Sequence, residues 1–289
     1  MRKLISLMLL IVVILTAIGC SGKPGTNTPE LANQQEPAVP SPDPTPEVVT
    51  PNVPDVTTTP APTEPEPEPE NPLNNEPIAQ NYHMTSNYYI KPNDENDNKK
   101  VVLLTFDDGP KEEKMLTDLL DILDKHNAKA IFFVNGYRIK QNPELLKLIH
   151  DRGQIIGNHA WDHINLKKEN AEKIDQQISD VQTIVKELTG ELPVFFRPPF
   201  GAANDEVRAK VKEAGMLFMT WSNGSLDWAD NVRKPQGVID SVMEQLAPGS
   251  NILMHEVAWT VEALDALLTK IEEQGYSFID PRVIELEAR

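Results

Sequence analysis

The chain has 289 residues and a formal net charge of −17, and residues 99–289 alone carry −8. An acidic domain repels phosphate backbones, which argues against a nucleic-acid partner, whereas a neutral or amino-bearing glycan is compatible with it. Cys20 is the only cysteine, which excludes a disulfide within the chain.

The first twenty residues have the pattern of an export signal. A basic start is followed by an apolar stretch over residues 4–19 and then by Cys20, as in secretory signal peptides. Residues 17–20 resemble a bacterial lipobox, in which cleavage precedes the cysteine and its thiol is acylated. We expect residues 1–19 to be a lipoprotein signal peptide. Cys20 is then expected to anchor the chain on the outer face of the cell membrane, facing the cell wall. Ordinary secretion and an uncleaved anchor are the alternatives.

Residues 21–77 hold sixteen of the 25 prolines, including a strict Pro-Glu alternation over residues 64–70. Proline fixes φ and the glutamates repel one another, so this composition predicts an extended, disordered spacer. We draw the predicted linker over residues 20–98 and the folded domain over residues 99–289. Packing of residues 78–98 against the domain is left open.

Strands and helices are predicted to alternate along the domain. The predicted strands cover residues 101–106, 130–135, 154–157, 194–197, 217–222, 251–255 and 276–279. Helices are predicted over residues 112–126, 143–152, 169–188, 204–214, 235–246 and 257–274. This order predicts an α/β fold with about seven parallel strands in a distorted or incomplete (β/α) barrel, with an open doubly wound sheet as the alternative.

Two adjacent carboxylates, Asp107 and Asp108, follow the apolar strand at residues 101–106 and precede Gly109 and Pro110. Sites in α/β folds are built where parallel strands end. Neighbouring carboxylates repel unless a cation or a shared proton relieves them. Because an acidic turn has the same sequence pattern, the pair alone leaves a site and a turn equally open.

Two histidines, His159 and His163, follow the third predicted strand. On one helical turn, a spacing of four places both imidazoles on the same side, where they can bind one metal ion. With Asp108 they supply two nitrogens and one oxygen and leave open positions for water and substrate.

Three further polar residues lie at or soon after the ends of predicted strands. Arg197 ends the fourth strand and can pair with a carboxylate, which would hold that carboxylate ionised. Asp227 follows the fifth strand and His255 ends the sixth. Asp beside His is the usual arrangement for orienting an imidazole and raising its pKa.

Five motifs in this order resemble those of the polysaccharide deacetylases of carbohydrate esterase family four. They are Thr105-Phe106-Asp107-Asp108-Gly109-Pro110, His159-x-x-x-His163, Arg197-Pro198-Pro199, Asp227-Trp228 and Leu253-x-His255. The resemblance implies a distorted (β/α) barrel and metal-dependent N-deacetylation of acetamido sugars, usually with zinc.

The resemblance implies a role for each residue on the nucleophile side of the site. Asp108, His159 and His163 would hold the metal, most often Zn²⁺, with Co²⁺ or another divalent ion as alternatives. Asp107 would be the general base that deprotonates the metal-bound water, and Arg197 would orient and charge Asp107. Amide hydrolysis fits such a site, because a metal lowers the pKa of its water from about 16 towards about 7.

The same resemblance implies the acid side and the substrate pocket. His255 would protonate the leaving amine, tuned by Asp227. Trp228 and Leu253 would wall the pocket for the acetyl methyl group, and the backbone N–H of Phe200 is a candidate oxyanion donor.

Three positions depart from the family pattern. Ala160 replaces a hydroxyl residue that commonly follows the first metal histidine, Gly224 stands where the family often has Asp, and Glu256 replaces an Asp after the last histidine. None of them removes a proposed ligand, acid or base. They bear on the level of activity and on the substrate range.

We therefore expect a metal-dependent hydrolase that removes N-acetyl groups from N-acetylglucosamine of peptidoglycan or a related cell-surface polysaccharide and releases acetate. N-acetylmuramic acid, chitooligosaccharide, exopolysaccharide and acetylxylan are alternative substrates. A wall-binding protein with this fold but little turnover is the alternative class. The expected partners are the wall glycan and, through the anchor, the membrane, and the domain is expected to be monomeric.

Overall fold

The computed structural model describes residues 78–288. The expected signal peptide, the lipidation site Cys20 and linker residues 21–77 lie outside this part of the chain. Within residues 78–288, none of the helices combines the length and the apolar composition needed to cross a bilayer.

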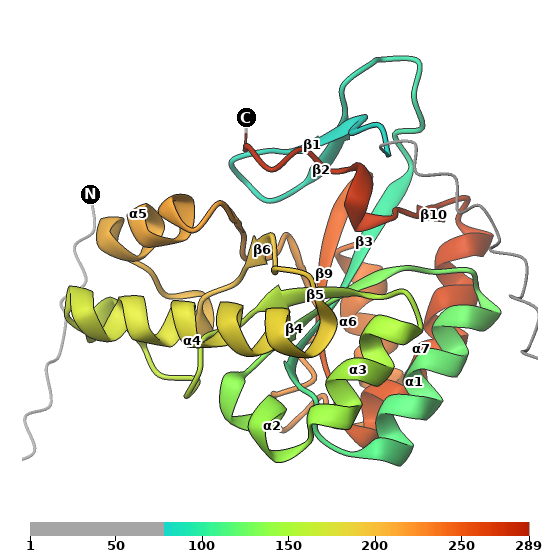
Figure 1. Ribbon diagram of the computed structural model, residues 1–289. Helices are drawn as coiled ribbons and strands as arrows, with labels where there is room; N and C mark the ends of the chain where they lie inside the picture. The colour runs from blue at the N-terminus through green and yellow to red at the C-terminus, as the bar shows by residue number, and fades with distance from the viewer. Residues whose placement is uncertain (1–77, 289) are drawn as a thin grey trace, which may run out of the picture. The chain divides into compact units, whose positions relative to one another are not determined.

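A parallel sheet forms the centre of the domain (Figure 1). Its longest strand, β3 (Val101–Gly109), lies between β4 (Ala130–Val134) and β9 (Ser250–His255). The other strands are β5 (Ile155–Asn158), β6 (Phe195–Phe196), β7 (Leu217–Phe218), β8 (Asn223–Gly224) and β10 (Ser277–Phe278). The order is β7-β6-β5-β4-β3-β9-β8, and β10 pairs with the first residues of β3.

This strand order is that of a barrel with one gap. The strands follow one another in chain order around the sheet, and the consecutive strands β7 and β8 lie at its two edges. A doubly wound sheet would instead reverse its order at an internal switch point. The expected incomplete (β/α) barrel is therefore confirmed.

Helices connect the strands, as the predicted alternation requires (Figure 1). They are α1 (Glu113–Lys125), α2 (Gly136–Gln141), α3 (Pro143–Asp151), α4 (Ala171–Thr189), α5 (Asp205–Glu213), α6 (Pro235–Glu244) and α7 (Ala258–Glu273). Short 3₁₀ turns are η1 (Leu166–Lys168), η2 (Pro199–Gly201) and η3 (Pro281–Val283). The predicted helices do not include α2, a short helix that Asn142 alone separates from α3.

The continuous apolar run of β3 is explained by burial on both faces. Val102, Leu104 and Phe106 pack in the layer under the helices, together with α1 and α7. The alternate residues Val101 and Leu103 pack in the barrel interior. Successive side chains of a strand point to opposite faces, so a strand covered on both sides needs apolar residues at every position.

Only the first two residues of the strand predicted at residues 217–222 form a strand, β7, and the chain then crosses to β8 on the other edge of the sheet. β7 pairs with β6, whereas β8 pairs with β9 on the far edge. Residues 219–222 cross the gap between them, with Met219 N–H bonded to Phe196 and Ser222 N–H bonded to Asn251. Periodicity could not reveal this crossing, because β7 and β8 have only two residues each.

Residues 78–98 do not continue the linker, and this part of the linker prediction is wrong. Strands β1 (Tyr82–Met84) and β2 (Ile90–Pro92) form an antiparallel hairpin, which Figure 1 shows beside the C-terminal segment. Met84 and Ile90 are fully buried in the cluster that fills the barrel interior. Burial of these two side chains holds the hairpin on the domain despite its polar composition.

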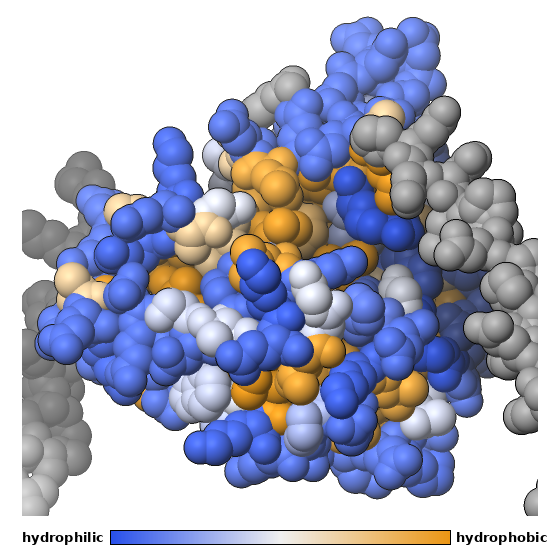
Figure 2. All heavy atoms as spheres, in the orientation of Figure 1, coloured by the Kyte–Doolittle hydropathy of each residue, from blue (hydrophilic) through white to orange (hydrophobic). Residues whose placement is uncertain are grey.

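The face shown in Figure 2 is mostly hydrophilic, with apolar side chains in the hollow between the hairpin and α4. A cavity of about 300 Å³ at the amino ends of β5 and β6 is lined here by Ile155, Val194 and Ile284. It lies at the opposite end of the strands from the residues singled out by the sequence.

Candidate active site

Most of the predicted site residues line one cavity at the carboxyl ends of the strands. This cavity has a volume of about 480 Å³ and is lined by Asp107, Asp108, His159, His163, Pro198, Phe200, Gly201, Trp221, Trp228, Leu253 and His255. Arg197 and Asp227 are fully buried behind it, where they bond to Asp107 and His255. Trp221 was missed by the sequence analysis, because it lies in the segment that was assigned to a regular strand.

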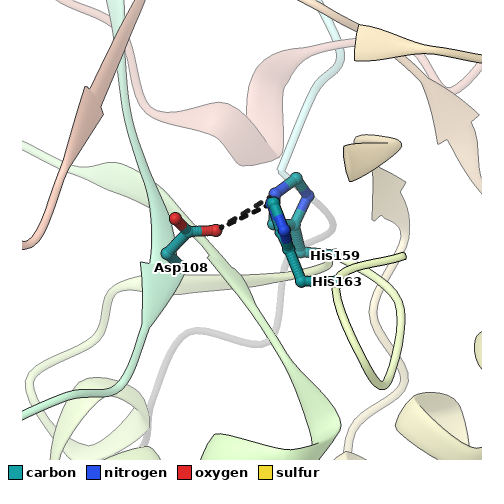
Figure 3. A group of neighbouring side chains, drawn as sticks. All are labelled: Asp108, His159 and His163. Carbon is teal, nitrogen blue, oxygen red and sulfur yellow. Dashed lines mark ion pairs between the residues drawn. The ribbon is translucent and has the colours of Figure 1, made fainter. Parts of the chain in front are cut away.

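Asp108, His159 and His163 turn their donor atoms towards one another (Figure 3). Asp108 Oδ1 lies 3.2 Å from His163 Nε2 and 3.5 Å from His159 Nε2. This buried oxygen has no hydrogen-bond partner of good geometry. Two imidazole nitrogens and one carboxylate oxygen are a donor set suited to Zn²⁺ or Co²⁺ with open positions. The three residues therefore fit a divalent metal ion.

An irregularity in β3 lets both carboxylates face the site. In a regular strand, Asp107 and Asp108 would point to opposite faces of the sheet. The register of β3 against β4 shifts between Asp107 and Gly109, and Asp108 has a left-handed φ of 67°. Such a bulge turns the side chain of one residue away from its regular direction.

The orientation of His159 is fixed by its other ring nitrogen. Nδ1 lies 2.6 Å from the Arg197 carbonyl oxygen and donates to it, which leaves the Nε2 lone pair directed at Asp108. Asn135, which sequence reasoning missed, donates from Nδ2 to the His159 carbonyl at 2.7 Å. Its backbone N–H donates to the Gly109 carbonyl at 3.0 Å. Asn135 thus connects the two segments that carry the candidate ligands.

The Ala160 position is supported without the hydroxyl that the family commonly has there. Ala160 is buried with a left-handed φ of 63°, and its N–H donates to Asn158 Oδ1 at 3.0 Å. Asp162 N–H donates in the same way to Gln177 Oε1 at 2.8 Å. Amide side chains therefore hold the loop between the two histidines.

Asp107 is held by a buried arginine. Arg197 Nη1 donates to Asp107 Oδ1 at 2.7 Å, and Asp107 Oδ2 lies 3.7 Å from His159 Nε2. The remaining donors of Arg197 bond to Thr105 Oγ1, the Thr220 carbonyl and Asn251 Oδ1. Burial lowers the pKa of Arg197 from its ordinary value, and the charge of Asp107 opposes this shift. One oxygen of Asp107 is therefore fixed, and the other remains for the cavity.

Opposing effects act on the ionisation of the candidate ligands. Burial alone would raise the pKa of Asp108, but the close contact with His159 and the charges of both histidines outweigh it and lower that pKa. Burial is the largest influence on His163 and lowers its pKa. An ionised carboxylate and a neutral imidazole are the forms that bind a metal.

Asp227 and His255 form a second pair across the cavity. Asp227 Oδ1 lies 2.7 Å from His255 Nδ1, and Asp227 Oδ2 accepts from the His255 backbone N–H and from Thr260 Oγ1. Burial acts to lower the pKa of His255, but the hydrogen bond and charge of Asp227 outweigh it and raise that pKa. Because Nδ1 is engaged, Nε2 is the ring nitrogen left for proton transfer.

Apolar side chains form the mouth and wall of the cavity. Phe200, which is 66% exposed, contacts His163 edge-on with ring centroids 4.7 Å apart. Trp228, which is 42% exposed, contacts His255 in the same manner at 5.4 Å. Leu253 is buried in the cavity wall. A Cβ added at Gly224 would lie 3.5 Å from Trp228 and 3.6 Å from Trp221, which is ordinary van der Waals contact, so the site has room for a small side chain there.

Comparison with known proteins places this geometry in a family. The family model for polysaccharide deacetylase matches residues 94–219. The chain is 35% identical over 199 residues to the peptidoglycan-N-acetylmuramic acid deacetylase PdaA of Bacillus subtilis, a match that covers 67% of this chain and 75% of PdaA. The chain belongs to the polysaccharide deacetylase family. Asp227 and His255 lie beyond the residues that the family model matches, and the structure brings both to the same site.

Two further relatives of this chain differ in their named activity. The peptidoglycan-N-acetylglucosamine deacetylase PgdA of Listeria monocytogenes is 39% identical over 181 residues, which cover 62% of this chain and 38% of PgdA. The chain thus spans about two fifths of the length of that relative. BA3943 of Bacillus anthracis, described as a pseudoenzyme of carbohydrate esterase family 4, has a structure that matches with a TM-score of 0.60 at 34% identity and covers 63% of each chain.

Proposed function

We propose that residues 99–289 hydrolyse the N-acetyl groups of N-acetylglucosamine in peptidoglycan or a related cell-surface polysaccharide and release acetate. One observation carries the proposal: a carboxylate held by Arg197 and an imidazole held by Asp227 flank the Asp108–His159–His163 triad in one cavity. Hydrolysis of an amide is promoted by a base for the water, an acid for the leaving amine and a group that stabilises the oxyanion, and these residues can supply all three.

The residues of the chain have separate tasks in this reaction. Asp107 accepts the proton of the attacking water through the oxygen that Arg197 leaves free. A divalent ion held by the triad would lower the pKa of water and polarise the acetyl carbonyl. As the bond between the carbonyl carbon and nitrogen breaks, His255 donates its proton to that nitrogen, and the products are acetate and a free amine. Asp227 keeps His255 oriented and protonated.

Zn²⁺ is the ion that we propose, with Co²⁺ or another divalent ion as alternatives. Support comes from the donor set of two neutral nitrogens and one carboxylate oxygen. Elemental analysis of the full-length chain, isolated without added metal, identifies the ion. Zinc near one equivalent per chain is the expected result, and a chain that retains no divalent metal would contradict it.

The proposal also includes the cellular location of the enzyme. Residues 1–19 would be a lipoprotein signal peptide, Cys20 the lipidation site and residues 21–77 a spacer, which places a monomeric catalytic domain between the membrane and the wall. Support comes from the sequence pattern of residues 1–77 and from the activities that PdaA and PgdA are named for. Membrane fractionation of the wild type and Cys20→Ser tests it, because only the wild type should remain with the membrane.

A second candidate function is a wall-binding protein with little turnover. The similarity to the BA3943 pseudoenzyme and the departures at Ala160, Gly224 and Glu256 favour it. The intact base, acid and ligand set favours the enzyme instead.

Acetate release separates the two functions. The metal-loaded full-length chain is incubated with N-acetylglucosamine oligomers and with peptidoglycan, with and without a chelator, beside Asp107→Asn. We expect acetate from the wild type, none after chelation and none from Asp107→Asn, which should keep its metal because Asp107 is not a ligand. Binding of peptidoglycan without acetate from any acetamido glycan would establish the second function.

A further inference from the structure

Glu256 is a buried carboxylic acid beside the site that takes no part in the proposed reaction. It follows His255 directly, and its side chain is only 1% exposed. Oε2 accepts a hydrogen bond from the backbone N–H of Lys111 at 3.1 Å, whereas Oε1 is buried without a partner. Burying a carboxylic acid with one oxygen unpaired is costly, which indicates that this position does more than fill space.

The Glu256 carboxyl packs on the backbone next to a candidate metal ligand. An added Cβ at Gly109 would lie 1.8 Å from Glu256 Oε1 and 2.7 Å from its carboxyl carbon. Only a glycine leaves room for this contact. Glu256 therefore touches the chain on both sides of Pro110, at Gly109 and at the Lys111 N–H.

This turn carries the strain that directs Asp108 into the site. Asp108 has a left-handed φ of 67°, a conformation that is uncommon for a residue with a side chain. Conformations of this kind persist when surrounding contacts hold them. On one side the Gly109 carbonyl accepts from the Asn135 N–H, and on the other Glu256 holds Lys111.

We propose that Glu256 is a positioning residue for Asp108, and that its contacts with Gly109 and Lys111 hold the Asp108 carboxylate where it can share a divalent ion with His159 and His163. The inference rests on the proposed metal site. Glu256 touches no reacting atom and acts only through the turn at residues 109–111.

The raised pKa of Glu256 makes Gln and Met suitable replacements for it. Burial raises its pKa to about 7. The hydrogen bond from the Lys111 N–H and the charges of Lys111 and Arg138 act in the opposite direction but are outweighed. The neutral amide of Glu256→Gln is therefore a close substitute, and its oxygen can still accept from Lys111. Glu256→Met keeps an unbranched side chain of similar length but removes the acceptor. The two variants keep a similar side-chain length and differ in the hydrogen bond to Lys111.

The Zn²⁺ dissociation constant of the full-length chain in detergent, measured by competition with a chromogenic chelator, tests the inference. We expect Glu256→Met to bind Zn²⁺ about 10- to 100-fold more weakly than the wild type. Glu256→Gln should stay close to the wild type. With Co²⁺ as the probe, the visible absorption bands should change in the Met variant and not in the Gln variant.

Two controls separate positioning from general loss of stability and from failure of the metal site. Leu264→Ala removes a fully buried side chain of α7 and should lower Tm while leaving Zn²⁺ affinity unchanged. Asp108→Ala should lose the metal. The inference is overturned if Asp108→Ala loses Zn²⁺ while Glu256→Met, or Glu256→Ala where the Met variant does not fold, binds it like the wild type. Retention of Zn²⁺ by Asp108→Ala would overturn the metal site and the inference together.

Discussion

At the scale of single residues, Asp227 and His255 form the acid side of the proposed reaction. Asp227 is fully buried and accepts from the ring Nδ1–H of His255 at 2.7 Å, from its backbone N–H at 2.7 Å and from Thr260. The pKa of His255 is raised because this carboxylate outweighs the effect of burial. His255 therefore keeps its proton to a higher pH than an ordinary histidine.

Asp227→Asn should shift the alkaline limb of the pH profile of kcat to lower pH. His255 must be protonated to donate, so activity falls as pH rises through its pKa, and the variant lowers that pKa. We also expect the maximal rate to fall on the order of 10²-fold or more. The measurement is acetate release as a function of pH. Asp230→Asn, an exposed aspartate of the same loop, is the control that should match the wild type. An unchanged alkaline limb in Asp227→Asn would show that His255 is not the acid.

Sequence reasoning located the polar site residues because they lie at or soon after the ends of predicted strands, and the resemblance to the family supplied their roles. It brought Asp108, His159 and His163 together from the rule that parallel strands end at one edge. It could not find Asn135 or Trp221, because an amide after a strand and an indole in an extended segment have no distinctive spacing. It also could not foresee the bulge that turns Asp108 inwards, since that irregularity depends on the register with β4.

At the scale of elements, the backbone of the β1–β2 hairpin approaches the barrel backbone closely at Gly249. Ile90 N–H donates to the Gly249 carbonyl at 2.8 Å, and an added Cβ at Gly249 would lie 2.0 Å from the Ile90 carbonyl oxygen. Gly249 also has a left-handed φ of 86°. Both features require glycine here.

Gly249→Ala should therefore destabilise the domain by about 3 kcal/mol or more, because it adds a backbone clash to the strain of a left-handed residue. Gly190→Ala is the matched control. Its φ is 81°, but its Cβ would meet nothing within 4 Å, so a cost of about 1–2 kcal/mol is expected. Denaturant unfolding of both variants measures the difference. Equal costs would mean that the hairpin does not pack on Gly249.

The elements that were predicted correctly are determined by the residue pattern within each element. Those that were missed are determined by contacts with residues far away in the sequence. The strands β3, β4 and β9 appear as apolar runs, and the amphipathic spacing of α1 and α4 is visible in the sequence. Residues 219–222, which cross from β7 to β8, are held by a distant residue, because the Arg197 guanidinium bonds to the Thr220 carbonyl. The hairpin depends on Met84 and Ile90 finding the barrel interior.

At the scale of the whole molecule, the buried acid Glu256 makes the stability of the metal-free domain depend on pH. Its pKa is raised from 4.5 to about 7 by burial. Between these values the folded state holds a proton that the unfolded state has released. Stability therefore falls as pH rises through this window.

We expect the free energy of unfolding of metal-free Glu256→Gln to fall less between pH 4.5 and pH 7 than that of the wild type, by about 3 kcal/mol at most. Denaturant unfolding at several pH values, with the chelator present throughout, gives the two curves. Parallel curves for the wild type and the variant would contradict the raised pKa.

The proposed deacetylation reaction depends on one divalent ion shared by Asp108, His159 and His163. The most direct measurement is the metal content per chain of the full-length wild type, Asp107→Asn and His159→Ala after dialysis against Zn²⁺ and then metal-free buffer. We predict about one ion per chain in the wild type and in Asp107→Asn, and a sharply lower content in His159→Ala. Equal metal content in His159→Ala and the wild type would contradict the account.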